Sequence, residues 1–187
     1  MDELTTQYYN PQESDQVFLL LHGENNGFES PLMSQIFDAL RAKGSVYAYN
    51  FPYIAKGGIP SEGLVDEVAS FDQAIKFLVE EGKYQKIVVV GKSLGAIVAS
   101  FWLTEHKPEV TMELVVMGYV RKSVKTAALK DTLKLVVQGA EDRFGNGGAI
   151  EQELANYGVE ADVIEILGAD HSYRPGHEAE AIMAIQE

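Results

Sequence analysis

The chain has 187 residues, 46% of them hydrophobic, which suits a single domain over residues 1–187 with a sizeable buried core. Its formal net charge of −13 argues against binding to nucleic acid or to anionic membranes, because like charges repel at long range. It contains no cysteine, which excludes a disulfide framework, a thiolate metal site and a cysteine nucleophile. We expect a cytoplasmic protein, because residues 1–6 do not resemble a signal peptide and no apolar run is long enough to span a bilayer.

Apolar runs alternate with amphipathic segments along the chain. The first half predicts a strand over 17–21, a helix over 31–42, a strand over 45–49, a loop over 51–62, a helix over 63–80 and a strand over 87–90. The second half predicts a helix over 94–105, a strand over 113–117, a connector of one or two helical turns over 119–131, a strand over 133–137, a helix over 147–157, a strand over 163–167 and a helix over 177–186.

This order of elements indicates an α/β fold. Strands that are apolar on both sides and alternate with helices are typical of a mainly parallel sheet covered by helices on both faces, with right-handed crossovers. We expect about six strands, with the polar residues 1–15 wrapped around one edge. Ligand sites in such sheets lie at the carboxyl ends of the strands, so the residues that follow each strand are the candidates for function.

The segment from Gly91 to Gly95, Gly-Lys-Ser-Leu-Gly, follows an apolar strand and precedes a helical pattern. A serine on so sharp a turn adopts a strained backbone, and the flanking glycines avoid clashes with neighbouring backbone. The turn exposes the Ser93 hydroxyl as a nucleophile and directs the backbone N–H of Leu94 toward the same space at a helix N-terminus. In a chain with 17 glycines such a pattern also arises by accident, but the strand before it and the helix after it favour the nucleophile.

The loop after the first strand reads His-Gly-Glu-Asn-Asn-Gly from His22 to Gly27. We expect it to supply a second oxyanion donor, the backbone N–H of Glu24, since Gly23 and Gly27 let the backbone approach Ser93. His22 is expected to brace this loop by hydrogen bonding and not to take part in catalysis.

The loops after the last two strands supply an acid and a base. Glu141 and Asp142 both follow the strand over 133–137, and we favour Asp142 because its shorter side chain fixes an imidazole more rigidly; a turn or helix cap is the alternative role. His171 follows the strand over 163–167, and its neighbour Asp170 is poorly placed to hold the ring. The order Ser93, Asp142, His171 is the order expected for a catalytic triad on this sheet topology.

With these motifs the chain resembles the α/β-hydrolases over essentially its whole length, and most of all the small lidless branch near the dienelactone hydrolases and the testis-expressed-type hydrolases. The matching segments are 21–23, 91–95, 139–142 and 169–172, together with Tyr-Asn-Phe-Pro-Tyr over 49–53. The resemblance implies a minimal α/β-hydrolase fold. Residues 119–131 are too few for a cap domain, and serine replaces the cysteine of the dienelactone hydrolases.

The expected activity is hydrolysis of a small or exposed ester through an acyl-enzyme on Ser93, with no metal or cofactor. The aromatic residues just beyond the strand ends are expected either at the rim of the site or in plain packing: Phe28, Tyr53, Tyr119, Phe144 and Tyr173. Two alternatives stay open: a hydrolase-fold binding protein with little turnover, and a thioesterase or amidase with the same triad. The sequence does not decide the natural substrate or the oligomeric state.

Overall fold

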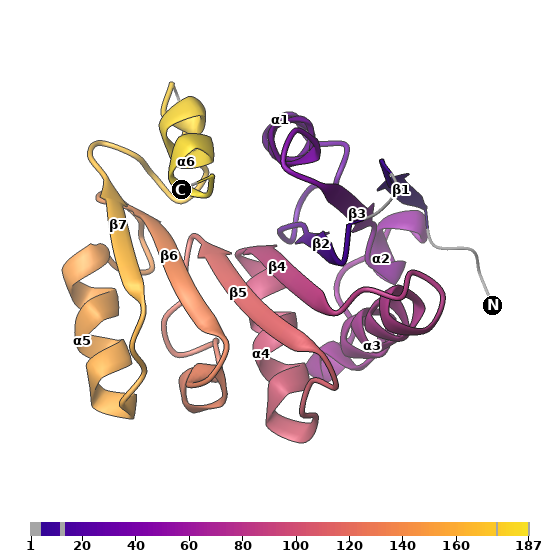
Figure 1. Cartoon of the computed structure of the whole chain (residues 1–187). Coiled ribbons are helices and arrows are strands. Elements are labelled where there is room, and N and C mark those ends of the chain that lie inside the picture. Colours follow the sequence, from indigo (N-terminus) through magenta and orange to yellow (C-terminus); the bar gives the residue numbers. More distant parts are fainter. Residues whose placement is uncertain (1–4, 12–13, 175, 187) are drawn as a thin grey trace.

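A sheet divides the molecule into two layers of helices (Figure 1). The structure, a computed structural model, describes residues 5–11, 14–174 and 176–186. The strands are β1 (Thr6–Tyr9), β2 (Gln16–Leu21), β3 (Ser45–Tyr49), β4 (Lys86–Lys92), β5 (Thr111–Met117), β6 (Leu133–Gly139) and β7 (Asp162–Ile166). The α-helices are α1 (Pro31–Arg41), α2 (Pro52–Ala55), α3 (Val65–Glu80), α4 (Leu94–Glu105), α5 (Gly147–Tyr157) and α6 (Glu178–Ala184); 3₁₀ turns lie at η1 (Glu62–Leu64) and η2 (Thr126–Leu129).

The strands lie in the order β1-β3-β2-β4-β5-β6-β7, and all neighbouring pairs are parallel except β1 with β3. Seven strands are therefore seen among the described residues, one more than predicted. The additional strand, β1, pairs with β3 from Thr6 opposite Tyr49 to Tyr9 opposite Val46. All four of its residues are exposed, so its sequence carries no core-facing pattern, and backbone pairing with β3 holds it at the sheet edge.

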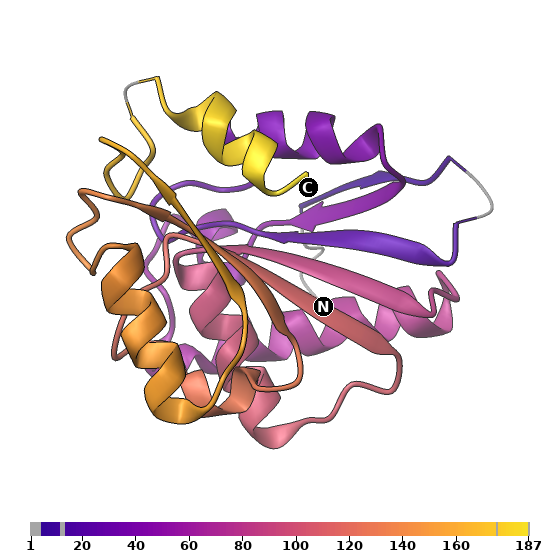
Figure 2. The ribbon, with the colours of Figure 1, turned by 60° about the vertical axis from the view of Figure 1, so that its left-hand side comes forward.

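Alternate residues of each central strand enter two separate cores. On β2, Val17, Leu19 and Leu21 pack toward α3, α4 and α5, whereas Phe18 and Leu20 pack toward α1 and α6. Figure 2 shows α1 and α6 side by side on one face of the sheet, with α3, α4 and α5 on the other. Helices on both faces explain why the strands read as continuous apolar runs.

Two connections bear on the site. The predicted loop over 51–62 contains the short helix α2, which begins at Pro52, a residue whose fixed φ favours the first helical position. Within the described residues between β5 and β6, the only regular element is the predicted short turn η2, so no cap domain is inserted there. In the part of the chain that the structure describes, no helix is both long and apolar enough to cross a bilayer.

Candidate active site

Ser93 lies at the sharp turn between β4 and α4, with φ 51° and ψ −107°. Its backbone N–H donates to the carbonyl oxygen of Met117 at 2.9 Å, which ties the turn to the neighbouring strand. A methyl group on Gly95 would lie 2.5 Å from the carbonyl oxygen of Leu21, and one on Gly91 would lie 2.8 Å from a backbone nitrogen of α4. The turn therefore requires both glycines, as the motif predicted.

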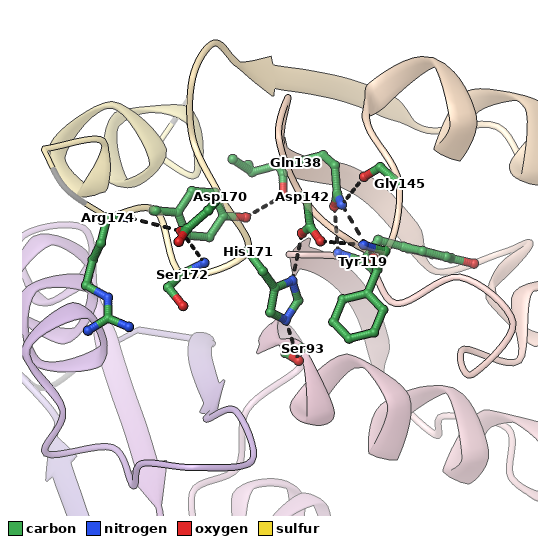
Figure 3. A network of polar contacts seen from close by, with 12 residues as sticks. Ser93, Tyr119, Gln138, Asp142, Gly145, Asp170, His171, Ser172 and Arg174 are labelled. Atoms are coloured by element: carbon green, nitrogen blue, oxygen red, sulfur yellow. Dashed lines mark hydrogen bonds and ion pairs between the residues drawn. The ribbon is translucent and has the colours of Figure 1, made fainter.

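Ser93, His171 and Asp142 meet at the carboxyl edge of the sheet (Figure 3). The Nδ1 of His171 lies 2.7 Å from Oδ2 of Asp142, and its Nε2 lies 2.9 Å from Oγ of Ser93. Because an ionised carboxylate only accepts hydrogen bonds, Nδ1 carries the proton and Nε2 is free to accept from the serine hydroxyl. The arrangement is that of a nucleophile, a base and a group that orients the base.

The acid of this group lies in the loop over 140–146 between β6 and α5, the acid loop. The Asp142 side chain is fully buried, and its Oδ1 accepts a hydrogen bond from the backbone N–H of Phe144 at 2.8 Å. The Phe144 ring packs edge-on against the His171 ring, with 4.8 Å between the centroids. Asn146, and not Asp142, caps α5. Glu141, the other candidate acid, is exposed.

The acid loop has a support that the sequence analysis missed. Gln138, at the end of β6, is fully buried. Its side-chain oxygen accepts from the backbone N–H of Tyr119 at 2.7 Å, and its amide group donates to the carbonyl oxygen of Gly145 at 2.7 Å (Figure 3). The one signal in the sequence is a polar residue directly after an apolar strand, since buried amides need partners on both sides.

The loop that carries His171 is shaped by Asp170. Oδ1 of Asp170 accepts from the backbone N–H of Ser172 at 2.7 Å and of Arg174 at 3.2 Å. Partial burial raises the pKa of Asp170, but these N–H groups outweigh that effect and the pKa falls below its ordinary value. Asp170 therefore organises the backbone of the loop, and Asp142 holds the ring, as expected.

The loop over 22–30 between β2 and α1, the oxyanion loop, is fixed by hydrogen bonds from the buried side chains of His22 and Tyr53. The backbone N–H of Phe51 donates to Nε2 of His22 at 2.9 Å, so Nδ1 carries the proton and donates to the carbonyl oxygen of Gly23. His22 is fully buried, and burial lowers its pKa, which favours this neutral form. The predicted bracing role of His22 is confirmed. The hydroxyl of Tyr53 donates to the carbonyl oxygen of Glu24 at 2.7 Å, a contact that the sequence did not indicate.

The contacts of His22 and Tyr53 orient one of the two predicted oxyanion donors, and the start of α4 orients the other. The carbonyl oxygen of Gly23 points to His22, and in a trans peptide the N–H of the next residue, Glu24, points the opposite way. The N–H of Leu94 opens α4 and has no acceptor within the helix. Among the described residues, no backbone acceptor outside regular elements is bonded to either N–H. Both donors are thus available to a ligand beside Ser93.

A pocket of 240 Å³ opens at this place, and its wall includes Gly23, Glu24, Ser93, Phe144 and His171. A larger hollow of 720 Å³ lies at the opposite end of β6; the described residues around it include neither serine nor histidine. We therefore place the candidate site at the smaller pocket. Among the described residues, no group of three or more His, Asp or Glu side chains is arranged to hold a metal ion.

The expected aromatic rim is largely wrong. Of the five aromatic residues expected at the rim, only Phe144 is among the described residues that line the pocket. Phe28 and Tyr53 are 6% and 5% exposed, and Tyr119 and Tyr173 are fully buried. The tyrosine side chains turn inward because their hydroxyls find partners there: that of Tyr173, for example, donates to a backbone carbonyl of β6 at 2.7 Å. Packing was the alternative given for each, and it holds for these four.

Comparison with known proteins identifies the fold. Residues 14–184 match the family described as the alpha/beta hydrolase domain. Three similar solved structures are an alpha-beta serine hydrolase homologue from Coxiella burnetii (TM-score 0.81, 16% identity, covering 96% of this chain and 88% of that one), a serine hydrolase without lid from Xanthomonas campestris (0.78, 15%, 98% and 85%) and a dienelactone hydrolase from Anabaena variabilis (0.76, 18%, 96% and 88%). No curated protein matches the chain. These likenesses show the fold.

Proposed function

The chain belongs to the alpha/beta hydrolase domain family, and on this premise we propose that it is a serine hydrolase that cleaves small or exposed carboxylic esters, a carboxylesterase. The observation that carries the proposal is the unbroken hydrogen-bonded path from Ser93 Oγ through His171 to the buried Asp142. The pocket beside Ser93 is small, and the described residues between β5 and β6 form no cap, so a short or projecting ester fits better than a long lipid.

Acylation starts at the Ser93 hydroxyl. His171 Nε2 takes its proton as Oγ bonds to the ester carbonyl carbon, and the carbonyl electron pair moves onto oxygen. The N–H groups of Glu24 and Leu94 donate to this oxyanion, and Asp142 stabilises the imidazolium. The C–O bond to the alcohol then breaks, and His171 returns the proton to the leaving oxygen.

Deacylation repeats these steps with water. His171 accepts a proton from water as the hydroxide bonds to the acyl carbon, and the tetrahedral species collapses with release of Ser93 Oγ. The proton passes from His171 back to Ser93, so the enzyme is regenerated. The proton transfers between Ser93 and His171 use atoms that already lie within hydrogen-bonding distance, and Asp142 is bonded to the same ring.

The proposal is tested with a fluorophosphonate, which reacts only with an activated serine. We expect a stoichiometric adduct that maps to Ser93 in the native chain and is absent in Ser93→Ala. The variant keeps the fold, since it loses one hydroxyl from a pocket wall, and circular dichroism checks this. A folded native chain without an adduct would contradict the proposal and favour the binding-protein alternative.

A positive result leads to a substrate panel. Short-chain esters, their thioester analogues and the matching anilides share an acyl group, so their relative kcat/KM values separate an esterase from a thioesterase or an amidase. We expect the esters to react fastest. The cytoplasmic location and the absence of nucleic-acid and membrane partners stay predictions.

A further inference from the structure

Lys92 precedes the nucleophile and is almost wholly buried, with 8% of its surface exposed. Its side chain lies in the core between the sheet and the His171 loop, where Nζ is 5.5 Å from the centre of the Tyr173 ring. Among the described residues, no hydrogen-bond acceptor or carboxylate is bonded to this ammonium. Lys92 also lines the pocket together with Ser93 and His171.

The ammonium and the catalytic imidazole border the same gap. A methyl group on Gly118 would lie 2.8 Å from Nζ of Lys92 and 2.9 Å from Cε1 of His171. Gly118, with φ +66°, leaves this gap open. The ammonium and the ring edge between the two nitrogens that bond Ser93 and Asp142 therefore border the same small space beside Gly118.

A buried lysine without a bonded partner destabilises the folded protein. Burial lowers the pKa of Lys92 to about 8, against the opposing effect of the carboxylates of Asp142 and Asp170. The charged form is thus disfavoured on folding, and an apolar side chain of the same length would fit the same place with less penalty. A residue that weakens the fold at this position calls for a functional explanation.

The charge balance of the site supplies one. Asp142 is a fully buried carboxylate, and its bonded partners, His171 Nδ1–H and the Phe144 N–H, are neutral while the imidazole awaits a proton. An uncompensated buried carboxylate would draw a second proton onto the imidazole, and an imidazolium cannot accept from Ser93. A cation near the Asp142 carboxylate and the His171 imidazole opposes the binding of that second proton.

We propose that Lys92 is a positioning residue of the active site, whose ammonium balances the buried Asp142 carboxylate and so keeps His171 free to take the proton of Ser93. The proposal rests on the proposed hydrolase function and deepens it. The other titratable or charged groups that face the lysine or share its pocket come from four elements: Asp170, Tyr173 and Arg174 in the His171 loop, Arg143 in the acid loop, Glu24 in the oxyanion loop and Glu178 at the start of α6. Their charges are mixed, and the two carboxylates that act most on Lys92 are Asp142 and Asp170.

The test is Lys92→Met, which keeps an unbranched apolar side chain and removes the charge. The rate of Ser93 labelling by the fluorophosphonate is followed from near pH 5 to near pH 9. On the acid side, the profile of the variant should fall off at a higher pH, with labelling about tenfold slower near pH 6. The two proteins should converge near pH 9, where Lys92 has itself lost its proton and no longer differs in charge from methionine.

Thermal unfolding supplies a second readout with the opposite sign. Below pH 8 the lysine is charged in the folded and unfolded states, and Lys92→Met should raise Tm by about 5 °C. Between pH 8 and 10.5 the folded lysine is neutral while the unfolded one keeps its proton, so the wild type gains stability and the difference shrinks. Greater stability together with slower labelling at low pH distinguishes the proposed role from a packing role.

Two variants complete the design. Lys92→Arg keeps the charge and should keep the acid limb at the wild-type pH. Lys86→Met, at the other end of β4, removes a half-exposed cation paired with Glu113 and should leave the labelling profile unchanged. Identical pH profiles for Lys92→Met and wild type, with normal labelling, would overturn this inference alone. Failure of the wild type to label at any pH would overturn the proposed function and this inference with it.

Discussion

The acid loop and the oxyanion loop serve the same site but are held in different ways. In the acid loop a side chain is the working group, and both oxygens of Asp142 are bonded in a buried setting. In the oxyanion loop the proposed working group is a backbone N–H, and the contacts of His22 and Tyr53 fall on backbone carbonyls. The side chain of Glu24 is itself exposed. A loop that acts through its backbone therefore depends on His22 at its own start and on Tyr53 outside it, and not on the side chain of Glu24.

The largest expected effect tests the acid loop directly. In Asp142→Asn the amide donates where the carboxylate accepted, which favours the wrong imidazole tautomer, and kcat should fall by about 10⁴-fold. Steady-state hydrolysis of the best ester from the panel measures it. Glu141→Gln, the same change on the exposed neighbour, is the control and should retain activity. A loss of less than tenfold in Asp142→Asn would show that another group orients His171.

The next effect tests the support of that loop. Gln138→Met keeps the volume but leaves the N–H of Tyr119 and the carbonyl of Gly145 without their buried partner. We expect a loss of about 3 kcal/mol in the free energy of unfolding, measured with urea. In addition kcat/KM should drop about tenfold, because the acid loop is no longer fixed. Gln152→Met on the exposed face of α5 should change neither quantity. Full activity in a destabilised Gln138→Met would show that the loop holds Asp142 unaided.

The comparison of the two loops also explains what the sequence could predict. Ser93, Asp142 and His171 could be predicted to lie together because each follows a predicted strand, and parallel strands bring their carboxyl ends to one edge. The role of Tyr53 in holding the oxyanion loop was not predicted, because its contact with Glu24 spans 29 residues and a tyrosine after a strand can have many roles. Placing the three tyrosine rings at the rim failed because their exposure is decided by which partner each hydroxyl finds.

The edge strand β1 and the burial of Lys92 were not predicted, for two other physical reasons. The strand β1 is exposed along its whole length, so the alternation that reveals a strand is missing, and only the free edge of β3 provides its place. Lys92 stood inside the recognised motif, yet a lysine is normally exposed, and its burial depends on the gap left at Gly118, directly after the neighbouring strand β5.

The smallest expected effect tests the oxyanion loop. Tyr53→Phe removes the hydroxyl that donates to the carbonyl of Glu24. The free energy of unfolding should fall by about 1 kcal/mol, the usual value for one hydrogen bond. The loop then rotates more freely, so the Glu24 N–H is less often directed at the oxyanion, and kcat should fall about fivefold with KM little changed, since the loss falls on transition-state stabilisation.

Tyr119→Phe is the matched control. The Tyr119 hydroxyl is hydrogen-bonded to Thr126 and Glu153 and not to the oxyanion loop. The variant therefore removes the same atom from another buried tyrosine. We expect a similar loss of stability with unchanged kcat. If both variants lose activity in proportion to stability, the hydroxyl of Tyr53 serves the fold alone. If Tyr53→Phe alone loses kcat, the backbone of the oxyanion loop is oriented from 29 residues away, and the two loops differ as their contacts indicate.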